Sequence, residues 1–242
     1  MSQQRGFDDA VRSFWSVRES QAAKQLASGK LDAGSRGSVT GGGHLDGIAK
    51  LLAQVFMEAG FAPSSIRKTS GIELPGFYRP TKSWDLVVIE NDILVAAIEF
   101  KSQVGPSFGN NFNNRTEEAL GNAVDVWRAY EEGTFGSVRP WLGYVFFVEE
   151  ASKSTTPVRL ARTVFPVEQI FEGTSYKDRY QILCQRLVRE RLYDAAYFVS
   201  SSVDPSVPVH QPSAELSFEN FVAAIAGRAA YIKALGDLHS DL

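Results

Sequence analysis

Two carboxylates and a lysine stand at one end of a pair of apolar segments. Asp85 stands near the start of the segment WDLVVIE, and Glu99 and Lys101 stand near the end of the segment ILVAAIEFK. Both segments are rich in β-branched residues and flank Asn91 and Asp92, a pattern typical of a β-hairpin. The three charged side chains should therefore lie at the same end of the hairpin. Glu99 and Lys101 differ by two positions, so they share one face.

This combination of side chains predicts phosphodiester cleavage. Two carboxylates held a few ångströms apart on a β scaffold suit a Mg²⁺ ion whose coordination is completed by water and phosphate. An ammonium group beside them can orient the attacking water and offset the charge of the transition state. We expect Asp85 and Glu99 to be the metal ligands and Lys101 to be the catalytic ammonium. The alternative is an edge strand whose charged end pairs with solvent or with Arg79.

The register of the hairpin decides whether both carboxylates can reach one ion. With a tight two-residue turn at positions 91–92, Asp85 would stand one step out of register with Glu99. The two side chains would then face opposite sides, because one step along a strand changes the face. A shared metal ion therefore predicts either a three-residue loop or a β-bulge near Asn91–Ile93.

A polar segment, NNFNNR at positions 110–115, follows the strand that carries Glu99. We expect it to be a loop before a helix over Thr116–Glu132, with Asn114 as the N-cap and Glu117 closing a capping box. Asparagine matches the donor and acceptor of adenine in the major groove, and arginine matches guanine. Asparagine is also common in turns, and the neighbouring Gly109 fits an ordinary turn. The sequence therefore favours the base-reading segment and the ordinary turn equally.

The net charge of the whole chain is −3, so a DNA-binding site would have to be a local basic patch. Between Ala151 and Arg191, eight Lys or Arg residues stand against four Asp or Glu residues, a local excess of +4. Solvated helix faces would account for this excess nearly as well as a DNA contact. We expect phosphate contacts from Lys82 and from the helix around Arg186 and Arg189. The expected base-reading residues are Asn110, Asn111, Asn113, Asn114 and Arg115.

Periodicity places these residues in an α/β architecture. The order from His44 onward is helix, strand, strand, strand, helix, strand, which predicts a mixed sheet with helices on its faces. We expect one domain over 1–242, with a core at about 44–201 and two appended helices. The expected helices are 7–27, 44–59, 116–132, 176–191 and 218–235, and the expected strands are 65–69, 84–90, 93–101, 141–150 and 193–201.

Other kinds of site find little support in the sequence. Cys184 is the only cysteine, which excludes a disulfide framework and a cysteine-rich zinc site and fits a reducing cytoplasm. The three histidines lack the spacing of a zinc-binding helix. We expect neither a secretory signal nor a membrane span. Asp46 is a possible supporting acid near the metal, although a favourable contact with a helix start explains it more simply.

Two long stretches closely resemble the XhoI family of type II restriction endonucleases. They are LPGFYRPTKSWDLVV and LVAAIEFKSQVGPSFGNNFNNRTEEALG, and the similarity is dense from Leu74 to Gly121. The resemblance implies a PD-(D/E)xK nuclease fold whose motif falls on Asp85, Glu99 and Lys101. It implies Mg²⁺-dependent cleavage of double-stranded DNA at CTCGAG after the first C, leaving a four-base 5′ overhang. It also implies a homodimer in a bacterial cytoplasm, with a companion DNA methyltransferase in the host.

One departure from the wider superfamily concerns the first acidic residue. Trp84-Asp85 stands where the superfamily often has Pro-Asp, so Glu90 and Asp92 are the alternatives to Asp85. Two other functional classes stay open. A DNA-binding protein of the same fold would not cut, but the intact Glu99-x-Lys101 motif argues against it. A repair nuclease or junction resolvase would read DNA structure instead of sequence.

Overall fold

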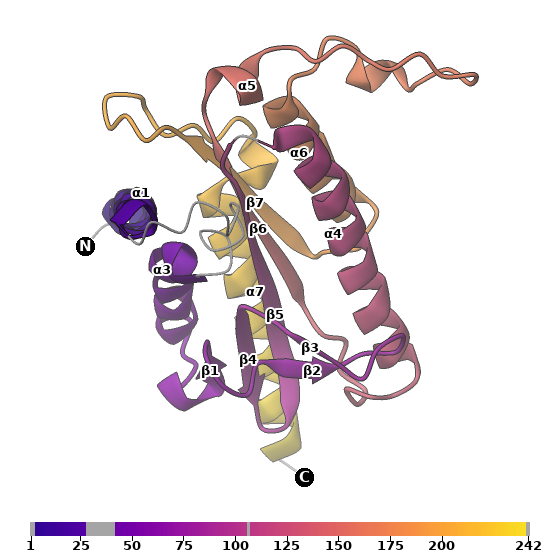
Figure 1. Cartoon of the computed structure of the whole chain (residues 1–242). Coiled ribbons are helices and arrows are strands. Elements are labelled where there is room, and N and C mark those ends of the chain that lie inside the picture. The colour runs from indigo at the N-terminus through magenta and orange to yellow at the C-terminus, as the bar shows by residue number, and fades with distance from the viewer. Residues whose placement is uncertain (1–2, 28–41, 106, 241–242) are drawn as a thin grey trace.

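The centre of the molecule is a five-stranded mixed sheet with the order β1-β4-β5-β6-β7 (Figure 1). The computed structural model describes residues 3–27, 42–105 and 107–240. Strands β1, β4 and β5 pair antiparallel, whereas β5, β6 and β7 run parallel. The strands are β1 Ile66–Arg67, β4 Leu86–Glu90, β5 Ile93–Gln103, β6 Leu142–Glu149 and β7 Ala195–Ser201.

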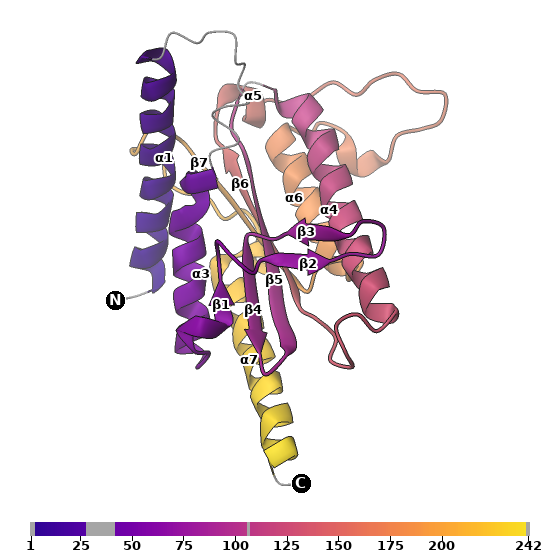
Figure 2. The same ribbon diagram turned by 60° about the horizontal axis from the view of Figure 1, so that its bottom comes forward.

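Helices cover both faces of this sheet (Figure 2). Helices α1, α3 and α7 pack on one face, and α4 and α6 pack on the other. The mixed α/β architecture expected from the sequence is thereby confirmed. Within the described part of the chain, no helix combines the length and apolarity needed to cross a membrane. The helices are α1 Gln3–Ala27, α3 Asp46–Glu58, α4 Phe108–Glu131, α5 Ser152–Thr155, α6 Tyr176–Arg189 and α7 Phe218–Ser240.

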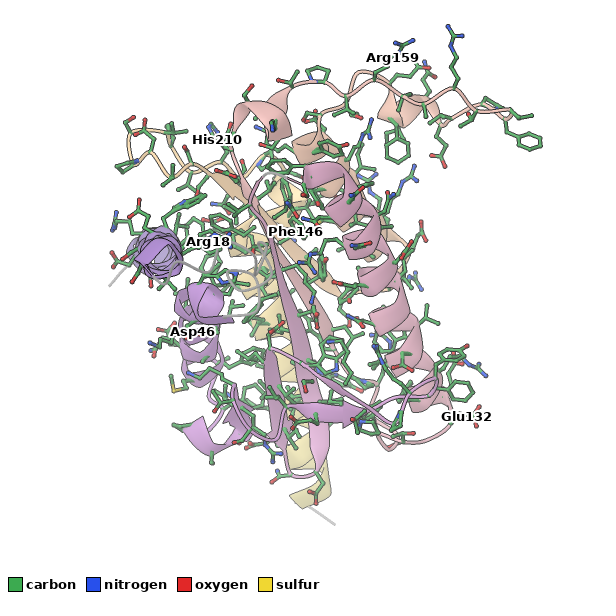
Figure 3. All side chains as sticks on the ribbon, viewed as in Figure 1. Arg18, Asp46, Glu132, Phe146, Arg159 and His210 are labelled. Atoms are coloured by element: carbon green, nitrogen blue, oxygen red, sulfur yellow. The ribbon has the colours of Figure 1, made fainter. Side chains whose placement is uncertain are left out.

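The apolar core has two halves, one on each face of the sheet. Strand β6 is buried along nearly its whole length, which is why its sequence is a continuous apolar run. On one face the ring of Phe147 stacks on Phe14 of α1, with centroids 3.9 Å apart. On the other face Phe146, which lies deep inside the molecule in Figure 3, stacks on Tyr180 of α6 at 4.3 Å. Alternate residues of one strand therefore anchor opposite helical layers.

Helix α4 begins earlier than the sequence predicts. The segment 110–115 belongs to its first turns, so the expected loop was wrong, and Asn114 is not the N-cap. Phe108 and Phe112, four residues apart, lie on one face of the helix and pack against Tyr176 and Tyr180 of α6. These contacts hold an asparagine-rich segment helical, because tertiary packing outweighs the weak helix propensity of asparagine.

A second hairpin, formed by β2 Glu73–Pro75 and β3 Thr81–Ser83, lies between the expected strands 65–69 and 84–90, where no strand was expected. Each strand is three residues long, and prolines flank the connection between them, so the alternation typical of strands hardly shows. The hairpin crosses in front of the sheet and reaches toward α4 (Figure 2). This hairpin carries Lys82.

A buried carboxylate on α4 fastens the tip of this hairpin. Asp125 Oδ1 accepts hydrogen bonds from the backbone N–H groups of Phe77 at 2.9 Å and Tyr78 at 2.7 Å. Its Oδ2 accepts one from Arg79 Nε at 2.7 Å. Burial opposes ionisation of Asp125, but these donors outweigh it and hold its pKa below the ordinary value. The tip of the hairpin is therefore fixed to the body of the molecule.

Candidate active site

The turn between β4 and β5 has two residues, so a three-residue loop was the wrong expectation. Glu90 pairs with Ile93 across the turn. Asn91 and Asp92 have φ values of 48° and 61°. Positive φ at both central residues is the geometry of a tight type I′ hairpin turn, which asparagine and aspartate tolerate better than most residues.

A β-bulge supplies the register shift that the turn does not. Val88 pairs with Ala96, whereas Ile89 pairs with Leu94, so Val95 is an extra residue on β5. Val95 and Ala96 are consecutive, yet both pack into the core half next to α1 and α3. The bulge restores the parity of the two strands, which confirms the second of the two expected solutions.

The bulge brings the two predicted acidic residues opposite each other. Leu86 pairs with Ile98, which puts Asp85 across from Glu99, one step closer to the strand end. Asp85 Oδ2 accepts a hydrogen bond from Phe100 N at 2.7 Å, which orients its carboxylate. Although Asp85 opens onto a cavity, the surrounding protein partly desolvates it and raises its pKa, and the charge of Glu99 adds to this effect.

Glu99 is buried, with 2% of its surface exposed, and each of its oxygens has a lysine partner. Oε1 pairs with Lys101 Nζ, and Oε2 accepts a hydrogen bond from Lys82 Nζ. Burial alone would raise the pKa of Glu99, but the two ammonium groups outweigh it and lower the pKa. Glu99 is therefore held as a buried carboxylate anion.

The two lysines differ in their other partners. Lys101 Nζ also lies 3.7 Å from Glu118 Oε2 on α4, and the same oxygen accepts a hydrogen bond from Arg115 Nη1 at 2.6 Å. Burial opposes the charge of Lys101, yet Glu99 outweighs it and raises the lysine pKa. For Lys82, burial prevails over the attraction of Glu99 and lowers the pKa.

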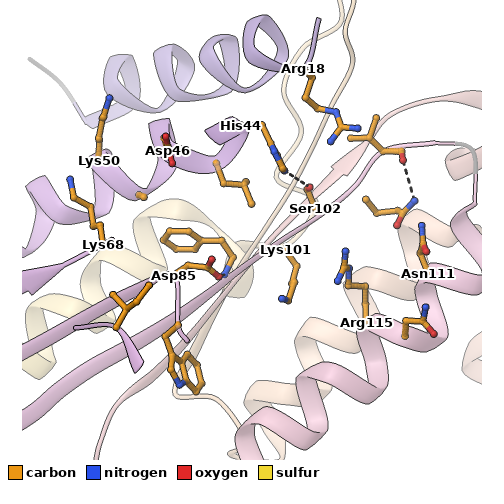
Figure 4. Close-up of a pocket in the computed structure, with 18 of the residues that line it drawn as sticks. Arg18, His44, Asp46, Lys50, Lys68, Asp85, Lys101, Ser102, Asn111 and Arg115 are labelled. Atoms are coloured by element: carbon orange, nitrogen blue, oxygen red, sulfur yellow. Dashed lines mark hydrogen bonds between the residues drawn. The ribbon is translucent and has the colours of Figure 1, made fainter. Parts of the chain in front are cut away.

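Some of these groups line a cavity of about 960 Å³ between the α3 side and the α4 side of the sheet (Figure 4), whereas Glu99 and Lys82 are not among the described residues that line it. Asp85 and Lys101 line its floor, where β5 ends. Basic and acidic side chains from the α1–α3 side form one wall, namely Arg18, Asp46, Lys50 and Lys68. The first turns of α4 form the opposite wall, with Asn110, Asn111, Asn114 and Arg115.

The matching family model describes restriction endonuclease XhoI and covers residues 24–209. The chain belongs to the XhoI family of restriction endonucleases. Type II restriction enzyme BstVI of Geobacillus stearothermophilus is 44% identical over 181 residues, which are 72% of this chain and 80% of that protein. AbrI of Azospirillum brasilense is 50% identical over 148 residues, 60% of this chain and 66% of that enzyme.

XhoI of Xanthomonas vasicola is also similar, with 42% identity over 181 residues that are 74% of this chain and 72% of that enzyme. The three relatives are all named type II restriction enzymes, which are site-specific deoxyribonucleases. The family and enzyme class expected from the sequence are thereby confirmed. No solved structure matches the chain.

The helical geometry of α4 places four of the five expected base-reading residues on the cavity side of the helix and one elsewhere. Asn110, Asn111, Asn114 and Arg115 recur at helical spacing on one side of α4 and line the cavity. Asn113 lies on another side of the same helix and is not among the described residues that line the cavity. Arg115 is also more enclosed than a surface reader would be, because only 18% of its side chain is exposed.

The three residues expected to contact phosphates each pair with a carboxylate of the protein. Lys82 points at Glu99 instead of outward, with 12% of its side chain exposed. Arg186 pairs with Glu168, and Arg189 pairs with Glu215 at 3.0 Å. Neither arginine is among the described residues that line the cavity. The local basic excess therefore marks helix α6 and the projecting segment that carries Arg159 (Figure 3), not the wall of the cavity.

Sequence reasoning missed part of the opposite wall. His44 Nε2 lies 3.1 Å from Ser102 Oγ, which ties the start of the α3 segment to the strand that carries Glu99. His44 and Ser102 are 58 positions apart, and no sequence motif links them, so this contact could not be predicted from the sequence. Asp46 lines the cavity, but the described residues contain no cluster of three or more His, Cys, Asp or Glu able to hold a metal ion.

Proposed function

We propose that this protein is a Mg²⁺-dependent type II restriction endonuclease that cuts double-stranded DNA at CTCGAG after the first C. The observation that carries this proposal is the placement of Asp85 opposite the buried Glu99, with Asp85 and the Glu99 partner Lys101 both lining a cavity. With the separate β2–β3 hairpin left aside, the order α3, β1, β4, β5, α4, β6 supports a PD-(D/E)xK nuclease core. The recognition site and the four-base 5′ overhang rest on the resemblance of the segments around this motif to the XhoI family.

The donor set fits a magnesium ion. Two carboxylates with oxygen donors face each other at the end of a hairpin, and Mg²⁺ is commonly held by one or two carboxylates together with water and substrate phosphate. Asp85 and Glu99 would hold the ion. When bound, it would polarise the scissile phosphate and make a bound water more acidic.

Side chains and one backbone amide of the protein would orient the metal ligands and stabilise charge in the site. Phe100 N orients the Asp85 carboxylate, and Lys82 and Lys101 keep Glu99 ionised. Lys101 is placed to orient the attacking water and to offset the negative charge that grows on the phosphate. Glu118 steadies Lys101 from the α4 wall, at 3.7 Å. Asp46, on the opposite wall, is at most a supporting acid.

The DNA strand around the scissile phosphate would enter the cavity between its two walls. The α4 wall, with Asn110, Asn111, Asn114 and Arg115, offers the side chains for reading base edges, and Asn113 is the member of this set with least support. Lys50 and Lys68 on the facing wall offer positive charges for DNA phosphates. They would make such contacts in addition to Lys82, for which the sequence predicts the same role. We further propose that residues 1–242 form one nuclease domain, that the enzyme is a homodimer in the bacterial cytoplasm, and that the host carries a companion DNA methyltransferase.

Digestion of a plasmid of known sequence in Mg²⁺, followed by sequencing of the ends, tests this function. We expect discrete fragments whose ends all map to CTCGAG with 5′ overhangs. No cleavage with retained DNA binding would indicate a silent DNA-binding protein. Cutting at junctions or at DNA ends alone would indicate a structure-specific nuclease. An Asp85→Asn preparation, purified in parallel, controls for contaminating nucleases.

A further inference from the structure

Both oxygens of the proposed metal-binding carboxylate are engaged by lysines. Lys101 Nζ pairs with Glu99 Oε1, and Lys82 Nζ pairs with Oε2. Each oxygen keeps a second lone pair, but an ammonium group held against it crowds and repels an approaching metal ion. Rearrangement of one lysine therefore favours binding of a divalent cation at Glu99.

The charges of the cluster point the same way. Asp85 and Glu99 carry two negative charges, and Lys82 and Lys101 carry two positive charges, so the four side chains balance. A divalent cation added to this cluster would leave a surplus of two positive charges in a site where Glu99 is almost fully buried. Repulsion between cations a few ångströms apart is strong in such a place. Departure of one lysine relieves part of it.

Lys82 is held less firmly than Lys101. Lys101 sits on the same strand as Glu99 and has a second carboxylate partner, Glu118. Lys82 comes from outside the main sheet, on β3, and its other contacts are the carbonyl oxygen of Ser83 at 3.0 Å and the ring of Trp84 at 4.3 Å. A neutral acceptor and an aromatic face hold an ammonium group less strongly than a second carboxylate does.

The backbone around Lys82 is fixed, so its departure needs only a side-chain rotation. Asp125 binds three donors at the tip of the β2–β3 hairpin, and the two strands pair at Lys82 itself, which lies across from Leu74. The lysine side chain has four rotatable bonds beyond this fixed backbone. It can leave Glu99 without moving the hairpin.

We propose that Lys82 is a displaceable counter-ion, which occupies Glu99 Oε2 in the metal-free protein and gives up that position when a divalent cation binds. This inference rests on the proposed metal site at Asp85 and Glu99. Lys82 is in these terms a positioning residue that acts through Glu99. Once released, its ammonium group is available to a DNA phosphate, so DNA and metal ion each favour the binding of the other. The free protein accordingly has low metal affinity.

Direct titration of the protein with Mn²⁺, without DNA and followed by electron paramagnetic resonance, tests the exchange. Lys82→Met removes the competing charge and should bind Mn²⁺ roughly tenfold more tightly than the wild type, or tighter still. Lys82→Arg keeps the charge and should bind as weakly as the wild type. Lys153→Met removes the same charge from an exposed position on α5 and should change nothing. Equal or weaker binding by Lys82→Met would overturn the exchange.

A second measurement uses the unaltered protein. Mild labelling with an amine-reactive ester, read by mass spectrometry, should modify Lys82 faster in the presence of Mn²⁺, because the metal ion releases it from Glu99. Lys177, whose ammonium group pairs with Glu150 at 3.1 Å outside the site, should react at the same rate with and without metal. Unchanged labelling of Lys82, in protein that binds Mn²⁺, would contradict the proposal.

The outcomes separate this inference from the proposed function. If the wild type binds Mn²⁺ and Lys82→Met binds no more tightly, the counter-ion role fails and the metal site stands. If neither protein binds Mn²⁺, and Asp85→Asn behaves identically, the metal site fails and the exchange fails with it. Binding by Lys82→Met alone would support the exchange in its strongest form.

Discussion

Asp85 and Glu99 lie opposite each other across β4 and β5, although the turn that joins these strands would by itself set them one residue out of register. The extra residue, Val95, corrects the parity inside the hairpin instead of at its tip. Two carboxylates meet at the strand ends as a result. Their meeting depends on one bulged position in a buried strand.

Asp85→Asn should reduce DNA cleavage by about a thousandfold or more, because it removes a charged group that we propose as a metal ligand, where phosphate charge must be stabilised. The side chain faces the cavity, so the midpoint of thermal unfolding should change little. Initial rates on a CTCGAG duplex and a calorimetric melt measure the two quantities. Cleavage close to the wild-type rate would remove Asp85 from the site and direct attention to Glu90 or Asp92.

Glu99→Gln should abolish cleavage as well, but with a loss of stability. Two partly buried ammonium groups, those of Lys82 and Lys101, would lose their carboxylate partner and repel each other. A thermal midpoint as high as that of the wild type would show that the lysines find other partners.

Arg115→Ala should weaken binding to the cognate duplex by about 1–3 kcal/mol and binding to random DNA much less, if Arg115 reads a base. Lys50→Ala should weaken both by similar factors and reduce the salt dependence by about one unit, as loss of a phosphate contact does. Affinities for both duplexes across a salt series decide between the two patterns. Equal losses for Arg115→Ala on the two duplexes would assign it to the support of Glu118 and Lys101.

The enzyme should sediment as a homodimer, at about twice the 26.6 kDa of one chain. A palindromic site presents the same base edges twice, and each chain carries one copy of the candidate site. Analytical ultracentrifugation, with and without a CTCGAG duplex, measures the mass. A single chain bound to the duplex at micromolar concentration would contradict the two-fold arrangement.

Asp125→Asn should lower the free energy of unfolding at pH 7 by about 2–3 kcal/mol, because the remaining oxygen is a neutral acceptor for the two backbone N–H groups and the new NH2 group faces the Arg79 donor. The pKa of Asp125 is depressed in the folded protein, so its contribution is present above the unfolded-state value of about 4. That contribution is lost as the pH falls through the folded-state pKa. Urea unfolding of both proteins at several pH values should show the difference shrinking toward acid, and a constant difference would contradict this origin.

The order of the main-sheet strands and of the helices that cover them, and the side chains available for chemistry, follow from the sequence alone. Strand periodicity requires Glu99 and Lys101 to share a face, and the apolar runs before them require a buried strand. These properties depend on neighbours in the chain, so they are readable without the fold. The same is true of the long segments around Glu99 that resemble the XhoI family.

How those side chains meet depends on contacts between segments that are distant in the sequence. The register of β5 depends on which residues of β4 it pairs with, and no local pattern announces the bulge at Val95. The start of α4 depends on rings supplied by α6, and Lys82 reaches Glu99 across 17 positions through a hairpin too short to show its periodicity. Contacts between distant segments carry energies that local propensity does not contain, and these contacts set the geometry of the site.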